Sequence, residues 1–356
     1  MPAKRSSVHI MTVAFALLLV SCDRTPNPKN LAIVGELTVY THFPANQLTT
    51  NLAVFKAKYP DIEVKVVADT SRRLAKRVLQ EQHDPQADVI WGMLVPDLIR
   101  LEWHNLLSPY TPAGIERMRL SFRDTGTPPF WVGLSAWMSA FCVNTAQLKA
   151  TGLPPPQGWS DLVDPIYKGR LAMPDPTRTH TGYMTVATVL QLYGETKGWK
   201  YLDRLHQNVA TYAPSPAQSC QLVGTGDVSV GISFGRAGAQ QKAQGAPIDV
   251  MFPIEGSGWS LEATALVKKG RIKLVAKTFL DWAISDHAMQ AYRQHHALTA
   301  VATRAPLPPV FPREPTAHLF DQDFPWSAAK RDTILSEWQH RYGDKVSQHD
   351  NAPGGS

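Results

Sequence analysis

The chain has 356 residues, a formal net charge of +6, 44% hydrophobic and 19% charged residues, 28 prolines and three cysteines. This length suits two domains, and the composition excludes both a globally disordered chain and a miniprotein built on a disulfide framework. The positive surplus is mild and forms no dense Lys/Arg stripe with interleaved aromatic residues, so we expect no nucleic-acid partner.

The chain begins with the pattern of an export signal. A basic start precedes an apolar run at 11–20, which is too short to span a bilayer comfortably, and Cys22 follows shortly after it. This junction resembles the bacterial lipoprotein signal, in which the cysteine carries the lipid, and Asp23 resembles an inner-membrane retention signal. We therefore predict a signal peptide at 1–21, lipidation of Cys22, and a periplasmic location at the outer face of the inner membrane. An ordinary cleaved signal with an incidental cysteine is the alternative.

Two further cysteines lie in the middle of the chain. The polar segment 22–34 is predicted to be a tether, and the body that follows it would lie in an oxidising compartment. Cys142 and Cys220 can form a disulfide there, with two buried free thiols as the alternative. No other apolar run in the sequence approaches membrane-spanning length.

Strand-like and helix-like segments alternate in the first third of the chain. Alternating polar and apolar residues predict strands, and apolar residues at helical spacing predict helices. In chain order we predict a strand at 36–40, a helix at 47–59, a strand at 62–67, a helix at 70–82, a short strand at 89–91 and a helix beginning at 96–102. Strands separated by such helices predict βαβ units and a parallel sheet.

The same alternation continues after an apolar run within 132–144. After Ala305 the chain is rich in proline and is predicted to form an extended strap, and 346–356 is predicted to be a disordered tail. Between these points we predict strands at 171–173, 208–212, 228–232, 248–252 and 260–267, and helices after Gly182, at 218–224, at 272–284 and at 328–342.

Catalytic and metal-binding motifs are absent from the sequence. There is no Walker loop, HExxH, CxxC or GxSxG pattern. His295 and His296 are adjacent at the end of an apparent helix, where side chains diverge by about 100°, so we interpret them as surface histidines. We predict neither an enzyme, nor a cofactor, nor a metal site.

Hydroxyl residues precede several predicted helices directly after a strand. The junctions are at 41–42, 69–71, 179–183 and 215–219. In open α/β sheets ligands bind at the carboxyl ends of strands, where helix N-termini favour an anion. Ordinary helix capping by Ser and Thr is the alternative for each junction. The pattern therefore predicts an anion site only if several junctions meet in one cleft.

Several short motifs together resemble one family of binding proteins. The resemblance runs from about residue 35 to about 295 and rests on the motifs at 37–41, 87–92, 141–144, 167–169, 173–176, 181–186, 230–233 and 255–259. It is to the type II periplasmic solute-binding proteins of ABC importers, on the branch of the 2-aminoethylphosphonate binders and related to the ferric-ion binders.

The resemblance implies an α/β fold with two lobes, each a mixed, mostly parallel sheet flanked by helices, and a ligand cleft between them. It implies lobe I at 35–131 plus 260–305 and lobe II at 132–259 plus 306–345. It also implies a monomer that delivers its solute to a membrane permease. The ferric-ion relatives use adjacent tyrosines where this chain has Phe234 and Gly235, so we do not expect iron.

The resemblance also implies which residues hold 2-aminoethylphosphonate. Glu255 is the first candidate for the ammonium group and Asp69 the second. His180 stands where relatives usually carry a small residue, so it or Arg178 adds a donor or occludes space. The full set of predicted ligand-binding residues is Tyr40, Thr41, His42, Thr70, Ser71, Trp91, Thr179, His180, Thr181, Gly182, Tyr183, Ser215, Ser233 and Glu255.

Other functions remain open at this point. The cleft could bind another small solute, such as a polyamine, a phosphate ester, a thiamine-like cation or a ferric ion. An exported hydrolase or a sensory module would share the same fold, because fold does not decide function.

Overall fold

The computed structural model describes Met1 and residues 33–350, with side chains as far as Val346. The predicted signal peptide, Cys22, most of the tether and residues 351–356 lie outside the described residues. No helix in the described part of the chain is long and apolar enough to cross a membrane.

The strands within residues 33–350 form one continuous hydrogen-bonded path. They are β1 (Gly35–Thr41), β2 (Ile62–Ala68), β3 (Val89–Leu94), β4 (Leu107–Ser108), β5 (Val132–Asn144), β6 (Leu171–Pro174), β7 (Val209–Ala213), β8 (Val230–Phe234), β9 (Ile248–Met251), β10 (Trp259–Val267) and β11 (Leu298–Thr299). Their order is β2-β1-β3-β10-β5-β8-β6-β7, with β4 beside β10, and with β9 and β11 beside β5.

Strand β5 divides this path into two sheets. Its first half, as far as Met138, pairs with β10 and β11, whereas its second half, from Ser139, pairs with β8 and β9. The predicted lobe boundary lies before Val132. The structure places the change of sheet within β5, because one long buried strand serves both sheets.

Both sheets are mixed. Strand β1 is parallel to β2 and β3, and β6 is parallel to β7 and β8. Strand β10 returns antiparallel to β3 and β5. This confirms the predicted α/β class with mixed sheets.

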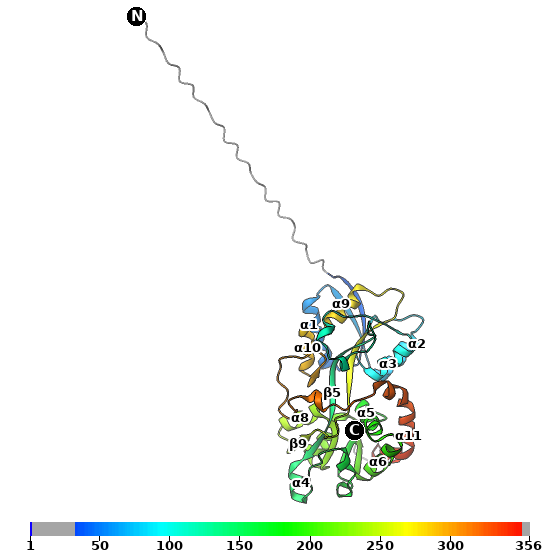
Figure 1. Cartoon of the computed structure of the whole chain (residues 1–356), viewed down its shortest axis with the longest axis vertical. Coiled ribbons are helices and arrows are strands. Elements are labelled where there is room, and N and C mark those ends of the chain that lie inside the picture. Colours follow the sequence, from blue (N-terminus) through cyan, green and yellow to red (C-terminus); the bar gives the residue numbers. More distant parts are fainter. Residues whose placement is uncertain (2–32, 351–356) are drawn as a thin grey trace. The chain divides into compact units, whose positions relative to one another are not determined.

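The helices cover the two sheets separately (Figure 1). They are α1 (Ala45–Lys58), α2 (Ser71–Gln80), α3 (Val95–Trp103), α4 (Thr145–Thr151), α5 (His180–Tyr193), α6 (Glu195–Asn208), α7 (Pro216–Thr225), α8 (Gly235–Ala243), α9 (Leu274–Ala283), α10 (Asp286–Arg293) and α11 (Phe324–Asp350). Helices α1, α2, α3, α9 and α10 belong with the sheet of β1, here called the first lobe, and α4 to α8 with the sheet of β6, the second lobe. The sequence analysis did not delimit α4, α6, α8 or α10.

Helix α11 contacts both lobes. It packs against α3 of the first lobe and against α5 and β7 of the second. It also extends through residues 346–350, which the sequence analysis assigned to a disordered tail. Where this extension begins, Val346 is buried and the Lys345 ammonium donates to the carbonyls of His206 and Val209, at 2.9 and 2.8 Å.

A disulfide joins Cys142 of β5 to Cys220 of α7, with the two Cα atoms 5.4 Å apart. This is the pairing that the sequence analysis considered possible in an oxidising compartment. Both side chains are fully buried in a small core with Val223 and Ile248.

We expect the double variant C142A/C220A to lose about 2–5 kcal/mol of unfolding free energy, because the crosslink restricts the unfolded chain. Urea unfolding of the oxidised wild type and the variant measures this difference. Reductant should then destabilise the wild type and leave the variant unchanged. Equal stability of the oxidised wild type and the variant would contradict the prediction.

Candidate ligand-binding site

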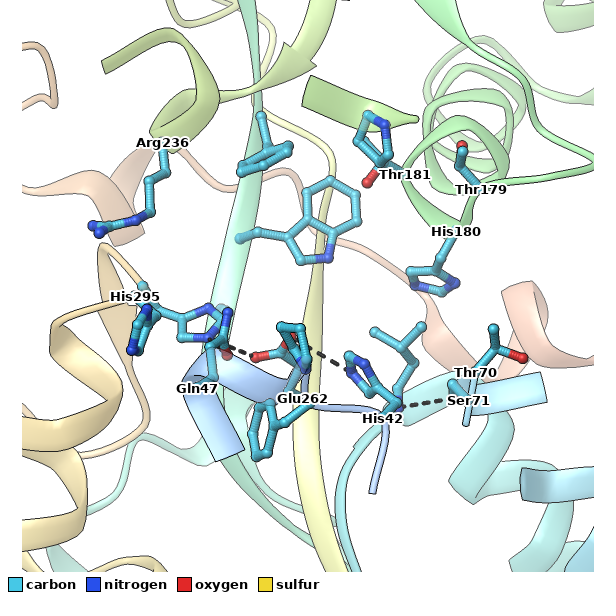
Figure 2. Close-up of a pocket in the computed structure, with 18 of the residues that line it drawn as sticks. His42, Gln47, Thr70, Ser71, Thr179, His180, Thr181, Arg236, Glu262 and His295 are labelled. Carbon is cyan, nitrogen blue, oxygen red and sulfur yellow. Dashed lines mark hydrogen bonds and ion pairs between the residues drawn. The ribbon is translucent and has the colours of Figure 1, made fainter. Parts of the chain in front are cut away.

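A cavity of about 890 Å³ lies between the two lobes. The first lobe contributes residues around His42, Thr70 and His296, and the second contributes residues around Thr179 and Arg236. Figure 2 shows Arg236 and His295 on one side, Thr70, Ser71 and the Thr179–Thr181 segment on the other, and Glu262 between them.

The N-terminal ends of four helices border this cavity. The N-cap residues Pro44 of α1, Thr70 of α2, Thr179 of α5 and Phe234 of α8 all line it. The first N–H groups of a helix have no partner within the helix, and the helix dipole places partial positive charge there. Each of the four predicted junctions therefore supplies a residue to this cavity, but a hydroxyl N-cap reaches it at only two of them, Thr70 and Thr179, while the others contribute His42 and Pro216.

The hydroxyls at these two junctions are partly engaged within the protein. Thr179 accepts the Gly182 N–H at 3.0 Å and donates to the Asp175 carbonyl, and Ser71 donates to Asp97 at 2.5 Å. Among the described residues, the Thr181 hydroxyl has no hydrogen-bond partner, although Thr181 is buried and lines the cavity. Thr181 is thus the hydroxyl most available to a ligand.

The close packing of α5 on β6 requires a glycine at position 182. A Cβ atom at this position would lie 2.4 Å from the carbonyl oxygen of Pro174 at the end of β6. The missing side chain lets the first turn of α5 approach the backbone of β6 closely. The glycine thereby positions Thr179 and Thr181 at the cavity.

Arg331 of α11 brings a buried positive charge to the cavity. Its side chain is 7% exposed, its guanidinium lies 4.4 Å from the centre of the Tyr183 ring, and its Nε has no hydrogen-bond partner among the described residues. Burial lowers the pKa of Arg331, while the nearby Asp97 raises it. A buried cation with an unsatisfied N–H gains from an anion placed beside it in the cavity.

Glu262 of β10 lies between two histidines. Its carboxyl is 3.5 Å from Nε2 of His42 and 3.3 Å from Nε2 of His296, and it accepts a hydrogen bond from Ser135. Burial raises the pKa of Glu262 to about 8 and lowers the pKa of His42 to about 4 and that of His296 to about 3. At neutral pH we therefore assign an uncharged carboxyl and two uncharged imidazoles to this cluster.

The interpretation of the histidine pair as surface residues was wrong for His296. This ring is buried and its Nε2 lies 3.1 Å from the amide oxygen of Gln47 on α1. His295 also lines the cavity, and its Nε2 is buried without a hydrogen-bond partner among the described residues. Adjacent side chains on a helix point in different directions. His295 and His296 instead lie after the last residue of α10, and both line the cavity.

His180 combines burial with an unused ring nitrogen. Its Nε2 lies 2.9 Å from the Ser260 hydroxyl, and its Nδ1 is buried with no partner among the described residues. Burial, with a smaller effect of Arg331, lowers its pKa well below the usual value. His180 therefore offers a neutral imidazole to the cavity.

Six of the predicted ligand-binding residues line the cavity: His42, Thr70, Ser71, Thr179, His180 and Thr181. The other eight do not line it. Two are aromatic residues of the first lobe: the Tyr40 hydroxyl donates to Glu81, and the Trp91 indole donates to the Tyr292 hydroxyl at 2.9 Å. Both rings are fully buried in the core, so they cannot form walls for a ligand.

The remaining predicted residues stabilise the protein locally. Thr41 accepts the Phe43 N–H, Tyr183 donates to the Ser327 carbonyl, and Ser233 donates to the Pro216 carbonyl. Ser215 is the N-cap residue of α7. Thr41, Tyr183 and Ser233 thus make hydrogen bonds within the protein, whereas the Ser215 side chain makes no cap hydrogen bond to α7.

Glu255 is also outside the cavity. Its carboxylate accepts the N–H groups of Trp159 and Ser160, both at 3.0 Å, and so caps the 3₁₀ helix Trp159–Val163. The sequence analysis chose Glu255 because it belongs to a family motif near Trp259. The cap was invisible in the sequence because the two partners are about 95 residues apart.

The sequence analysis missed several cavity residues. Those with chemically active groups are Gln47, Arg72, Asp97, Trp137, Arg236, Glu262, His296 and Arg331. Glu262 did carry a signal, because it is the only charged residue in the apolar strand 259–267. Arg331 carried none, since it is one of several charged residues on a long helix. No group of three or more His, Cys, Asp or Glu side chains within residues 33–346 is arranged to hold a metal ion.

The fold and its cavity define a two-lobed α/β binding protein of the type II periplasmic class. The periplasmic binding protein AfuA from Actinobacillus pleuropneumoniae, solved with exogenous fructose-6-phosphate bound, is 28% identical, with a TM-score of 0.74 over 88% of this chain and 99% of that chain. The family model described as bacterial extracellular solute-binding protein matches residues 84–325. The chain belongs to this family.

The curated proteins that are similar in sequence include one from Sinorhizobium fredii and one from Salmonella typhimurium. One is the Probable ABC transporter periplasmic-binding protein y4fP of Sinorhizobium fredii, 25% identical over 80% of this chain and 78% of that protein. The other is the Phosphoglycerate transport regulatory protein PgtC of Salmonella typhimurium, 26% identical over 49% of this chain and 44% of that protein. These names describe transport proteins and not enzymes.

Proposed function

We propose that this chain is the solute-binding component of an ABC importer and captures a small solute with a phosphonate or phosphate head group. The candidate ligand is 2-aminoethylphosphonate. One observation carries the proposal: the buried Arg331, with an unpaired Nε, lines the same cavity as the N-terminal ends of α2 and α5. Together these groups form an anion site that combines charge with directed N–H donors.

The head group requires the donors that this side of the cavity supplies. The Thr181 hydroxyl, the N–H groups of His180 and Thr181 at the start of α5 and the Arg331 guanidinium can each donate to a phosphonate oxygen. A tetrahedral anion has three such oxygens, so it can accept from several of these groups at once. A planar carboxylate would leave more of these donors unpaired.

A sugar phosphate is the second candidate. The cavity of about 890 Å³ exceeds what 2-aminoethylphosphonate alone needs, and AfuA was solved with fructose-6-phosphate. Hydroxyl groups of a sugar would find partners in the uncharged side chains of His42, His180, His296 and Gln47.

The proposal includes the membrane context that the sequence predicts. Lipidation of Cys22 would hold the protein at the outer face of the inner membrane. The protein would be a monomer, and the tether would let its folded body reach a permease. The similarity to y4fP, whose name includes ABC transporter, supports this context. Closure of the lobes around the ligand would produce the form that the permease recognises.

A calorimetric panel on the mature protein tests the proposal. We expect one molecule of 2-aminoethylphosphonate to bind per chain, with stabilisation of about 2.7 kcal/mol at a hundredfold excess over Kd. Ethylphosphonate should bind more weakly, and no product should form from any ligand. Tighter binding of fructose-6-phosphate would favour the second candidate. Binding of a polyamine but of neither phosphorus compound would contradict the anion site.

A further inference from the structure

Three carboxyl groups line the cavity, and they differ in what already surrounds them. Asp69 is exposed, lies 3.5 Å from Arg73 and accepts the Thr70 N–H. Asp97 accepts the Ser71 hydroxyl and acts electrostatically on Arg331. Only Glu262, among these three, has no cationic side chain beside it.

The surroundings of Glu262 are polar but uncharged. Ser135 on β5 donates to the carboxyl. His42, in the loop after β1, and His296, just after α10, lie beside it, and Tyr292 on α10 acts on it electrostatically. Burial lowers the pKa of both histidines to about 4 and about 3 and raises that of Tyr292 beyond the physiological range. None of these groups therefore supplies a positive charge at neutral pH.

We propose that Glu262 is the specificity-determining residue that binds a cationic amine of the ligand. This inference rests on the proposed function, which places the anionic head of the same ligand near Arg331. Figure 2 shows Glu262 between the histidine pair on one side and His42 on the other, and Glu262 and Arg331 line the same cavity. This role requires one zwitterion to reach both groups. A buried carboxylate without a cation of its own gains most from an ammonium group that enters the cavity.

Binding then has a proton balance that can be measured. Burial holds the pKa of Glu262 at about 8 in the empty cavity, so the carboxyl carries a proton at about pH 7. An ammonium group beside it favours the carboxylate, and the proton leaves to the solvent because both histidines are poor acceptors. Affinity for an amine ligand should therefore rise with pH until the carboxyl of the empty cavity is ionised, near pH 8.

The test compares 2-aminoethylphosphonate with ethylphosphonate, which lacks the amine, on the wild type and on E262Q. Glutamine has the shape of the protonated carboxyl, so the fold of the empty protein should be retained. We expect the wild type to prefer the amine ligand by about 100-fold and E262Q to bind both ligands about equally. E36Q, which changes an exposed carboxylate of β1 paired with Lys65, serves as the matched control.

Calorimetry in buffers of different ionisation enthalpy supplies the second readout. The wild type should release close to one proton with 2-aminoethylphosphonate at about pH 7 and much less with ethylphosphonate, and E262Q should abolish the difference. Equal affinities on the wild type, or an unchanged preference in E262Q, would overturn the role of Glu262. If neither phosphonate binds the wild type, the proposed function fails instead. Loss of the preference in D69N alone would assign the amine to Asp69.

Discussion

Replacement of Arg331 by methionine is expected to weaken binding of a phosphonate ligand by about 2–5 kcal/mol, the usual effect of removing one partner of a buried charge pair. The guanidinium is almost fully buried at the cavity, and its Nε has no protein partner among the described residues. A ligand anion would therefore provide the main compensation for this charge. Methionine keeps a long apolar stem against Tyr183 and removes only the charged end.

The empty protein should respond in the opposite way. An uncompensated buried cation is costly, so R331M is expected to unfold at the same or a higher urea concentration than the wild type. Calorimetric titration and urea unfolding of one preparation measure both effects. The control is R341M on the same helix, where the arginine pairs with Glu337 and Asp203 outside the cavity. A stable R331M that binds 2-aminoethylphosphonate normally would contradict an anion site at Arg331.

Replacement of Trp91 by alanine is expected to cost about 3–5 kcal/mol of unfolding free energy, as for other large side chains removed from a core. The Trp91 ring is fully buried and lies 5.1 Å from Phe43, 5.3 Å from Phe279 and 5.9 Å from Trp282, measured between ring centroids. Its indole N–H also donates to the Tyr292 hydroxyl, which would lose this partner.

Urea unfolding followed by circular dichroism measures the loss. Trp103 at the end of α3 provides the control, because it is 54% exposed and its removal should change stability by less than about 0.5 kcal/mol. A W91A protein as stable as the wild type would contradict the assignment of Trp91 to the core. It would support the prediction that Trp91 contacts the ligand.

The order of elements was largely predictable because hydrophobic periodicity is local. The predicted strand at 62–67 and the predicted helix at 70–82 correspond closely to β2 and α2. Capping was the stated alternative for the junction at 69–71, and the Thr70 side chain does accept the Arg73 N–H. Each of these features depends on residues within one or two turns of each other, so the sequence contains the whole interaction.

The candidate site was predictable only where it coincides with such local features. Thr70 and Thr179 were found because a cap is visible next to its helix. Glu262 stands out in the sequence as the one charged residue of its apolar strand, but nothing local shows that it is buried at the cavity, or that Glu255 caps a 3₁₀ helix about 95 residues away. Long-range packing distinguishes them, and neither composition nor spacing encodes it.

The sequence by itself determined the α/β class, the alternation of elements and the capped helix starts, because these follow from side-chain periodicity along the chain. The tertiary structure decided which hydroxyl groups of the four junctions line the cavity, that α11 brings Arg331 to it, and that His296 is buried beside Glu262. The sequence shows which residues carry charges and hydroxyl groups. Their effect depends on desolvation and on partners that only the folded chain brings within a few ångströms.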